Sequence, residues 1–301
     1  MNRWMILRLF IFFIGMALSG LGLVLNGVAN AASPAETLKS TYLTLEPVLS
    51  DNPFYQESRE GEHSLQGDVY GVVNYPLDHV RKALDTAAAW CEIAILHINV
   101  THCTPGSEPQ KPTLVLQIEK KTGGTPVFDS TLRYNFHLAA AHPGYVQIIL
   151  TADEGPLGTR DYRMILEAVA VSSDKTFLHF SYSYGYGFQA RTATAVYLAT
   201  LGRKKIGFTV IGHDAKGDRI YIDGVRGVME RNTVRYFLAI RVHLGALHLP
   251  PEQWFERGIQ DWFAATERYP RQLHEMDKES YLAAKRQGRT TSGTIRVDHK
   301  E

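Results

Sequence analysis

The side chains best suited to bind a ligand or to move a proton lie between residues 160 and 186. Arginine grips carboxylate and phosphate groups through a planar fork of donors, and tyrosine supplies an apolar wall with one hydroxyl. Histidine can exchange a proton near neutral pH. The candidate ligand-binding residues of this segment are Arg160, Tyr162, Arg163, His179, Tyr182 and Tyr184.

These residues are expected to lie on β-strands, where successive side chains point to opposite faces. Arg160 and Tyr162 then share one face and Arg163 takes the other, while Tyr182 alternates with His179 and serines. A concave tyrosine face would give apolar walls with hydroxyl groups, and a concave serine face would leave room for a ligand. The sequence leaves both arrangements open, together with the alternative of an ordinary half-buried strand.

The charged residues of the segment allow three interpretations. Arg160 or Arg163 inside a cavity would indicate an anionic amphiphile as ligand. The same arginines could instead pair with Asp161 and Glu167 across a sheet surface. His179 with either of these two acids could form an acid–base pair, although scattered histidines are more often surface or core residues.

Motifs of common enzyme classes are missing from the chain. It contains no Gly-x-Ser-x-Gly elbow, no His-Glu-x-x-His, no P-loop and no dinucleotide fingerprint. We therefore expect no cofactor and no metal, assign no catalytic residue, and leave open whether a reaction is catalysed. The formal net charge of +1 lacks the basic excess that a nucleic-acid partner requires, so this class of partner is excluded.

A second group of candidates lies on a long helix predicted over residues 228–247. Its apolar residues recur at helical spacing from Met229 to Leu247. Asn232 and Tyr236 lie on or beside this stripe and are further candidate ligand-binding residues, because a polar group on a buried stripe needs a partner. The charged positions predicted to lie away from the stripe are Glu230, Arg231, Arg235 and Arg241.

The elements that would position both groups follow from hydrophobic periodicity. Helical spacing predicts helices over 34–49 and 77–91, the second with Asp78 as its cap, around a strand over 65–75. Period two then predicts strands on short turns, which implies an antiparallel meander. The ranges of these strands are 93–102, 113–120, 131–139, 145–152, 160–171 and 176–186. After them we predict a helix over 188–201, a hairpin from 206–211 and 219–222, and helices over 252–269 and 279–286.

Cys91 and Cys103 are the two cysteines of the chain. In an oxidising compartment they are expected to pair, which would stabilise the fold by about 3 kcal/mol through closure of a short loop. A zinc site with His97 and His102 is the formal alternative, but the cysteine spacing fits no standard metal pattern.

The first residues have the pattern of an export signal. Two arginines precede an apolar run from Leu9 to Leu25, and small residues before Ala31 fit a cleavage site there. An uncleaved inner-membrane anchor is the alternative. We expect a periplasmic or secreted protein with no spanning segment after signal removal. The expected division is 1–31 signal peptide, 32–64 helical lead-in, 65–248 main domain, 249–288 helical extension and 289–301 disordered tail.

The main domain resembles the START-like superfamily of lipid-transfer domains and polyketide cyclases. The resemblance rests on the strand over 67–76 that meets a proline and a helix entry, on residues 160–163 and 177–184, and on the amphipathic helix over 228–247. It implies an α+β helix-grip fold, with a curved antiparallel sheet wrapped around a long C-terminal helix. Unlike most members, this chain has a helix and a hairpin before that helix and extra helices after it.

The resemblance also implies a function and a class of partner. We expect the cavity to bind or transfer a hydrophobic small molecule or lipid, with envelope proteins as a further expected class of partner. An enzyme of the cyclase or hydrolase type using the same cavity is one alternative. A non-catalytic envelope assembly protein, whose cavity is filled by its own side chains, is the other.

Overall fold

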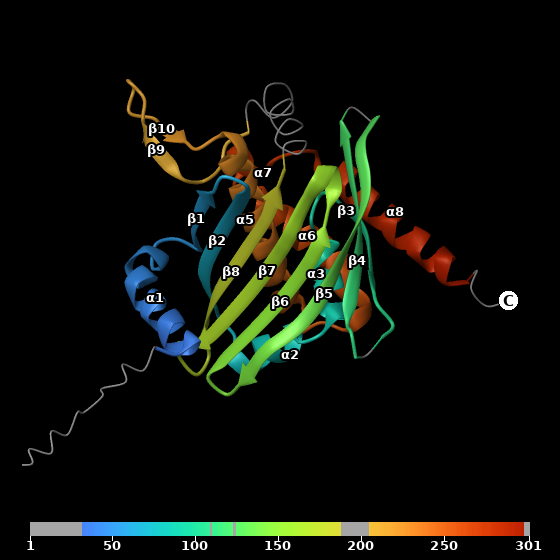
Figure 1. The fold of residues 1–301 in the computed structure, drawn as a ribbon, viewed down its shortest axis with the longest axis horizontal. Helices are drawn as coiled ribbons and strands as arrows, with labels where there is room; N and C mark the ends of the chain where they lie inside the picture. Colours follow the sequence, from blue (N-terminus) through green and yellow to red (C-terminus); the bar gives the residue numbers. More distant parts are fainter. Residues whose placement is uncertain (1–31, 109, 123–124, 188–204, 298–301) are drawn as a thin grey trace, which may run out of the picture. The chain divides into compact units, whose positions relative to one another are not determined.

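The computed structural model of the chain describes residues 32–108, 110–122, 125–187 and 205–297. Their largest feature is an eight-stranded antiparallel sheet in the order β1-β2-β8-β7-β6-β5-β4-β3 (Figure 1). Its strands are β1 (Tyr55–Glu60), β2 (Ser64–Val73), β3 (Val100–Pro105), β4 (Thr113–Thr122), β5 (Thr125–His142), β6 (Tyr145–Glu154), β7 (Thr159–Ala170) and β8 (Thr176–Tyr186).

Helices pack against both faces of this sheet. The long helix α5 (Gly224–Ala246) packs on the concave face against β1, β2 and β8, and α1 (Pro34–Leu49) packs on the outer face (Figure 1). Behind α5 lie α6, α7 and α8, and α2 and α3 fill the space beside it. Their bounds are α2 (Leu77–Leu84), α3 (Ala87–Ala94), α6 (Pro251–Thr266), α7 (Pro270–Leu273) and α8 (Lys278–Val297).

Two glycines of β2 bring α5 close to the sheet. A Cβ atom at Gly67 would lie 2.3 Å from Thr233 Oγ1, and one at Gly71 would lie 2.7 Å from Phe237 Cζ. Both contacts are too short for any side chain, so β2 needs glycine where the helix crosses it. The expected α+β helix-grip fold is thus confirmed, with a gripped helix that joins a continuous hydrophobic core.

The elements predicted between residues 55 and 102 need correction. The polar residues after 55 were expected in a lead-in, but they form β1 at the edge of the sheet. The helix predicted over 77–91 is two helices, because Thr86 caps α3 by accepting a hydrogen bond from the Ala89 amide at 3.2 Å. Asp78 makes no capping hydrogen bond. The strand predicted over 93–102 starts only at Val100, since Ile93 still belongs to α3.

The C-terminal region differs from the prediction in one further way. Disorder was expected after Gly288, but α8 continues to Val297. This helix is held by Lys285, whose buried ammonium group donates to the carbonyl oxygens of His97 and Val100 at 2.6 and 2.7 Å. The predicted hairpin is confirmed as β9 (Val210–His213) and β10 (Arg219–Tyr221). The helix predicted over 188–201 and the signal peptide predicted over 1–31 lie outside the described residues.

In the parts of the chain that the structure describes, no helix is both long and apolar enough to cross a membrane.

Three charged residues of α5 are buried, although the sequence placed them away from the apolar stripe. Glu230, Arg231 and Arg235 are 1–3% exposed. The reason is that α6, α7 and the segment around Phe208 cover the side of α5 that faces away from the sheet. Glu230 there accepts hydrogen bonds from the amides of Phe208 and Thr209 at 2.6 and 2.9 Å. Each buried charge therefore has a protein partner.

Candidate functional site

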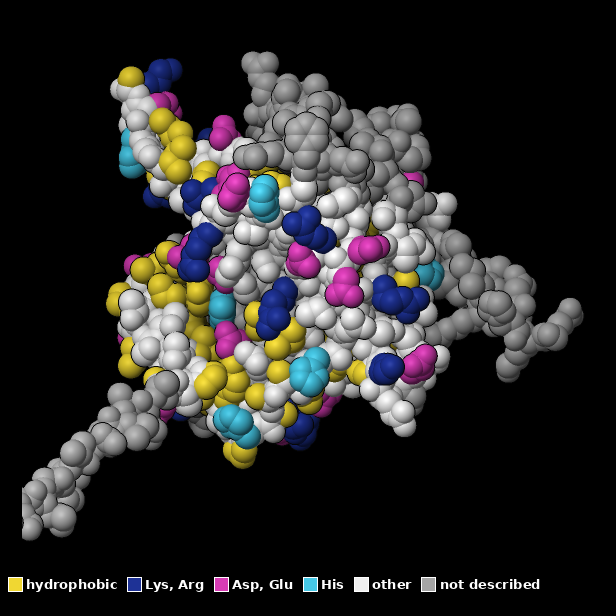
Figure 2. All heavy atoms as spheres, in the orientation of Figure 1, with side chains coloured by type: hydrophobic (Ala, Val, Ile, Leu, Met, Phe, Trp, Pro, Cys, Tyr) yellow, Lys and Arg dark blue, Asp and Glu magenta, His cyan; other side chains and the backbone are white. Residues whose placement is uncertain are grey.

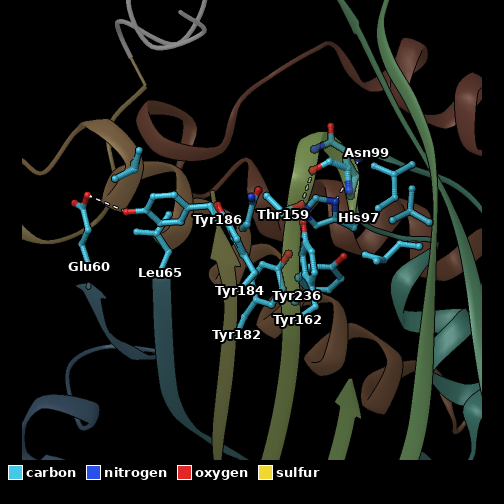
Figure 3. Close-up of a pocket in the computed structure, with 16 residues that line it drawn as sticks. Glu60, Leu65, His97, Asn99, Thr159, Tyr162, Tyr182, Tyr184, Tyr186 and Tyr236 are labelled. Carbon is cyan, nitrogen blue, oxygen red and sulfur yellow. Dashed lines mark hydrogen bonds between the residues drawn. The ribbon is translucent and has the colours of Figure 1, made fainter. Parts of the chain in front are cut away.

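A cavity of about 220 Å³ lies between the concave face of the sheet and α5 (Figure 3). Strands β7 and β8 and helix α5 supply aromatic walls, and the turn after α3 supplies polar groups. The aromatic lining consists of Tyr162, Tyr182, Tyr184, Tyr186 and Tyr236, and the polar lining includes His97, Asn99, Thr159 and Asn232. Apolar side chains complete the wall: Leu65, Val100, Ile118, Leu132 and Val225.

The tyrosines contact one another across the cavity. Tyr162 and Tyr184, on neighbouring strands, stack with ring centroids 5.2 Å apart. Tyr182 meets Tyr236 of α5 edge to face at 5.7 Å. Such pairs favour defined relative positions of the rings. The Tyr162 hydroxyl is 2.7 Å from Thr159 Oγ1, which fixes its direction.

His97 is the polar group of the cavity with an unsatisfied nitrogen. Its ring stacks on Tyr236 at 4.5 Å, and its Nδ1 accepts a hydrogen bond from the Asn99 amide at 3.3 Å. Its Nε2 is buried and makes no hydrogen bond of ordinary geometry with the described residues, although the Asn232 side chain lies near enough to oppose the lowering of its pKa. A buried polar atom without a partner is costly, so this nitrogen is a position where a ligand group would be stabilised.

His97 and the buried tyrosines Tyr182 and Tyr236 of the lining are neutral at physiological pH. Burial, together with the positive charges of Arg235 and Lys285, holds the pKa of His97 well below its usual value. Burial raises the pKa of Tyr182 and Tyr236 above that of a free phenol. These three side chains therefore offer hydrogen-bond donors and acceptors without charge.

The structure brings together five of the eight candidates chosen from the sequence. Tyr162, Tyr182, Tyr184, Asn232 and Tyr236 all line the cavity. The tyrosine face of β8 is thus the concave one, which answers the question that the alternating pattern left open. The Asn232 Oδ1 accepts a hydrogen bond from Arg235 at 3.4 Å, which orients the amide.

Arg160 and Arg163 do not line this cavity. Arg163 lies opposite Ser183 and is exposed on the outer face. The prediction that Arg160 shares a face with Tyr162 was wrong because a β-bulge interrupts the strand at Asp161, whose φ is 54°. The extra residue places Arg160 opposite Gly185, where it pairs with Asp161 at 3.1 Å. Among the described residues that line the cavity there is therefore no arginine to bind an anionic head group.

His179 lies on the outer face and forms a charged cluster there. Its Nδ1 is 2.9 Å from Glu167, and its Nε2 is 2.9 Å from Asp68 of β2. Tyr70 stacks on its ring at 4.4 Å. The pairing of His179 with Glu167 that the sequence suggested is present, whereas Asp161 has no part in it. Because the sheet separates this cluster from the cavity, we assign it to stability.

Sequence reasoning missed His97 and the apolar wall. His97 was weighed only as a metal ligand, but Cys91 and Cys103 are bonded to each other, so their sulfur atoms cannot hold a metal as thiolates. The disulfide joins α3 to β3 and fixes the turn that carries His97. This closed loop is the signal that could have located it. Among the described residues no cluster of histidine, cysteine and acidic side chains could hold a metal ion.

Comparisons with known proteins show likeness only among solved structures. No protein-family model and no curated protein matches the chain. Human StAR-related lipid transfer protein 5 is 11% identical, with a TM-score of 0.38. The match covers 71% of this chain and 96% of the human protein's chain. The Zhui aromatase/cyclase from a Streptomyces species is 13% identical with a TM-score of 0.30, and covers 68% of this chain and 95% of its own.

A conserved protein of unknown function from Enterococcus faecalis is 9% identical with a TM-score of 0.33, and covers 76% of this chain and 95% of its own. The classification rests on the chain's own topology. A strand pair, two helices, an antiparallel meander and a long helix held against the concave face follow one another in the order of the helix-grip architecture. The fold of this chain is START-like, with additional C-terminal helices.

Proposed function

We propose that this protein binds a small, neutral, mostly apolar molecule in the cavity between the sheet and α5. The observation that carries the proposal is the cavity itself, which has aromatic and aliphatic walls and a buried, unpartnered His97 nitrogen. Burial of the ligand's apolar surface supplies the free energy of binding. One hydrogen bond to His97 or Asn232 would set its orientation.

The charge of the lining supports a neutral ligand. Among the described residues that line the cavity, Glu60 is the one Asp, Glu, Lys or Arg side chain, and it is exposed at the rim. Transfer of an ionised group from water to such a site is costly without an opposite charge. A hydroxyl, carbonyl or amide group on the ligand could hydrogen-bond to the neutral lining instead.

The size of the cavity favours a small ligand. Its volume of about 220 Å³ lies below the roughly 300–1,000 Å³ that is usual for drug-sized ligands. It therefore suits a single ring system or one short acyl chain better than a phospholipid with two chains. Within the expected class of hydrophobic molecules and lipids, we propose the smaller members.

A second candidate function is an enzyme that uses the same cavity. The observation that favours it is His97, whose neutral imidazole could accept a proton through its unpartnered Nε2. Replacement of His97 by glutamine would abolish turnover of a bound molecule if this candidate is correct. A mass spectrum of the ligand before and after incubation distinguishes a carrier, which leaves it unchanged, from an enzyme.

Export is part of the proposal. The apolar run from Leu9 to Leu25 and the disulfide between Cys91 and Cys103 both support an oxidising compartment outside the cytoplasm. The N-terminal sequence of protein recovered from the periplasm tests this point. A start at Ala32 is expected if the leader is cleaved after Ala31.

Filling the cavity is expected to abolish ligand binding. Ile118 of β4 lines the cavity, so Ile118→Trp places a large ring where the ligand would lie. Native mass spectrometry of wild-type protein from its host should show a one-to-one complex with an apolar molecule, and the variant should show the apo mass. We expect at least a 100-fold loss of affinity for the same molecule added back, as a steric clash removes most of its buried contact.

Ile149→Trp is the matched control. Ile149 of β6 pairs with Ile165 of β7 and does not belong to the cavity lining, so this variant should retain the ligand. Equal retention by both variants, or an apo mass for wild-type protein even after exposure to a lipid extract, would refute the proposal.

A further inference from the structure

A second hollow, a groove of about 800 Å³, lies outside the cavity site. The end of α1, strand β1, the β9–β10 hairpin and the start of α7 line it. Its walls carry aromatic rings, including Phe54 and Tyr221, and four arginines. These arginines are Arg219, Arg226, Arg268 and Arg271.

None of the four arginines has a carboxylate partner among the described residues. Arg226 donates to the Ser58 carbonyl oxygen at 2.7 Å, and Arg271 lies over the Tyr221 ring at 5.1 Å. Glu57 is the one acid in the lining, and it pairs with Arg59 at 2.7 Å. The formal net charge of the whole chain is only +1, so this groove concentrates positive charge locally.

Exposed hydrophobic side chains flank the same groove. The large exposed hydrophobic residues of the described chain are Leu43, Val48, Val210, Ile211 and Ile220, and Ile211 is 59% exposed. Two of them belong to α1 and three to the hairpin, the elements on either side of the arginines. Figure 2 shows hydrophobic side chains along α1 and along the projecting hairpin. Exposed apolar side chains gathered in this way mark an interaction surface.

We propose that the groove and its two flanking elements form a docking surface for a membrane that contains anionic phospholipids. Arginine binds phosphate through paired hydrogen bonds, and apolar side chains beside it enter the boundary between head groups and acyl chains. Charge complementarity selects this occupant, because the described lining of the groove presents four guanidinium groups against one acid, Glu57, which is paired with Arg59, and its rim presents aliphatic side chains.

Addition of a peptide strand to the edge of the sheet fits the groove less well. The free edge of β1 is covered at Ser58, which is 5% exposed and bonded to both Arg226 and Glu230 of α5. A continuous row of backbone groups for an incoming strand is therefore not present.

Residues of the docking surface and of the cavity lining are separated by only a few positions in the sequence. Hairpin strand β10 ends at Tyr221, and α5 begins at Gly224 with Val225 in the cavity lining. Docking would therefore bring the rim of the cavity near a membrane that contains apolar molecules. The docking proposal needs no bound ligand, so it can fail or succeed independently of the cavity proposal.

Binding to vesicles of defined composition tests the docking surface. Full-length mature protein should sediment with phosphatidylcholine vesicles that contain phosphatidylglycerol, and not with phosphatidylcholine alone. Each basic residue near an anionic surface contributes about fivefold to partitioning, so a variant with Arg219→Gln, Arg268→Gln and Arg271→Gln should bind on the order of 100-fold more weakly. Ile211→Ser should weaken binding by roughly tenfold. Arg226 is left unchanged because it holds Ser58.

The matched control removes three positive charges elsewhere. Lys82→Gln, Lys175→Gln and Lys278→Gln together leave the groove intact, so this variant should bind vesicles like wild type. Equal binding to both vesicle types, no binding to either, or equal loss in both triple variants overturns the proposal. Binding of inorganic phosphate that displaces the vesicles equally in wild type and the Ile211→Ser variant would assign the groove to a small anion instead. Ligand retention in the cavity is measured separately and is unaffected by these outcomes.

Discussion

Replacing Glu275 by glutamine is expected to lower the free energy of unfolding by about 3–5 kcal/mol, because it removes the counter-ion of two buried arginines. Glu275 lies between α7 and α8 and contacts Arg231 at 2.6 Å and Arg235 at 3.0 Å. Both arginine side chains are at most 4% exposed. Lys205 is its third partner. The loss would be measured by chemical denaturation at neutral pH.

The pKa of Glu275 gives the same prediction a pH dependence. Burial alone would raise this pKa, but Arg235, Lys205 and Arg231 together lower it to about 2 from 4.5. Because the pKa of Glu275 is lowered in the folded protein, its contribution to the free energy of unfolding is fully present above pH about 4.5. This contribution is lost as pH falls towards 2. Wild-type and Glu275→Gln proteins should therefore approach equal stability in strong acid.

Glu92→Gln is the matched control for this experiment. Glu92 is exposed on α3, and no ion pair holds it among the described residues. Its replacement should change the free energy of unfolding by less than about 0.5 kcal/mol. A loss of similar size in Glu275→Gln would contradict the structural role of the Glu275 cluster.

The Glu275 cluster also reaches the ligand cavity. Arg235 donates to Asn232, which lines the cavity, and its positive charge lowers the pKa of His97. With its counter-ion gone, Arg235 should depress the pKa of His97 further and lose its fixed position beside Asn232. The C-terminal helices thus contact the gripped helix and, through Arg235, the cavity residue Asn232. Under the proposed function, the extension would contribute to binding.

The His179 cluster is expected to lose about 3 kcal/mol of stability between pH 6 and pH 9.5. Burial alone would lower the pKa of His179, but hydrogen bonds and charges from Asp68 and Glu167 raise it to about 9 from 6.5. One pKa unit corresponds to about 1.4 kcal/mol, which gives the magnitude. Because the folded pKa is raised, this contribution is fully present below pH 6.5 and is lost as pH rises through 9.

The measurement is a difference between two stability curves. The free energy of unfolding of wild type minus that of His179→Gln should decrease by about 3 kcal/mol over this range. The comparison with His179→Gln is needed because burial also lowers the pKa of Lys285 to about 7. The contribution of Lys285 to the free energy of unfolding therefore rises with pH over the same range, equally in both proteins. His248→Gln is the control, since His248 is exposed. A flat difference for His179→Gln would show that the pKa of His179 is the same in the folded and unfolded states, which contradicts the cluster.

Proton NMR of the histidine side chains provides an independent check of the same cluster. The ring resonances of His179 should titrate with a pKa near 9. Those of His97 should remain in the neutral form through pH 6, because its pKa lies well below 6.5. An ordinary titration near 6.5 at either residue would contradict the geometry described for it.

The sequence predicted those features that depend on local patterns. Hydrophobic period two located six of the sheet strands in order, helical spacing located α5, and the two cysteines could pair only with each other. Alternation along β8 placed Tyr182 and Tyr184 together, and helical position placed Asn232 and Tyr236 on the stripe. These signals are local because a strand or a helix repeats its facing side chains at a fixed interval.

Other features were decided only by the tertiary structure. Nothing in the β8 pattern states which face is concave, since that depends on the side from which α5 packs. One extra residue at Asp161 moved Arg160 to the opposite face, and a bulge has no reliable local signature. Glu230, Arg231 and Arg235 became buried because later helices cover them, and Glu275, far along the chain, supplies the charge that makes the burial of both arginines possible. The sequence by itself determined the elements and the side chains that each could present. The packing of α5 against the sheet and beneath the C-terminal helices decided which of them meet, because burial depends on neighbours that are distant in sequence.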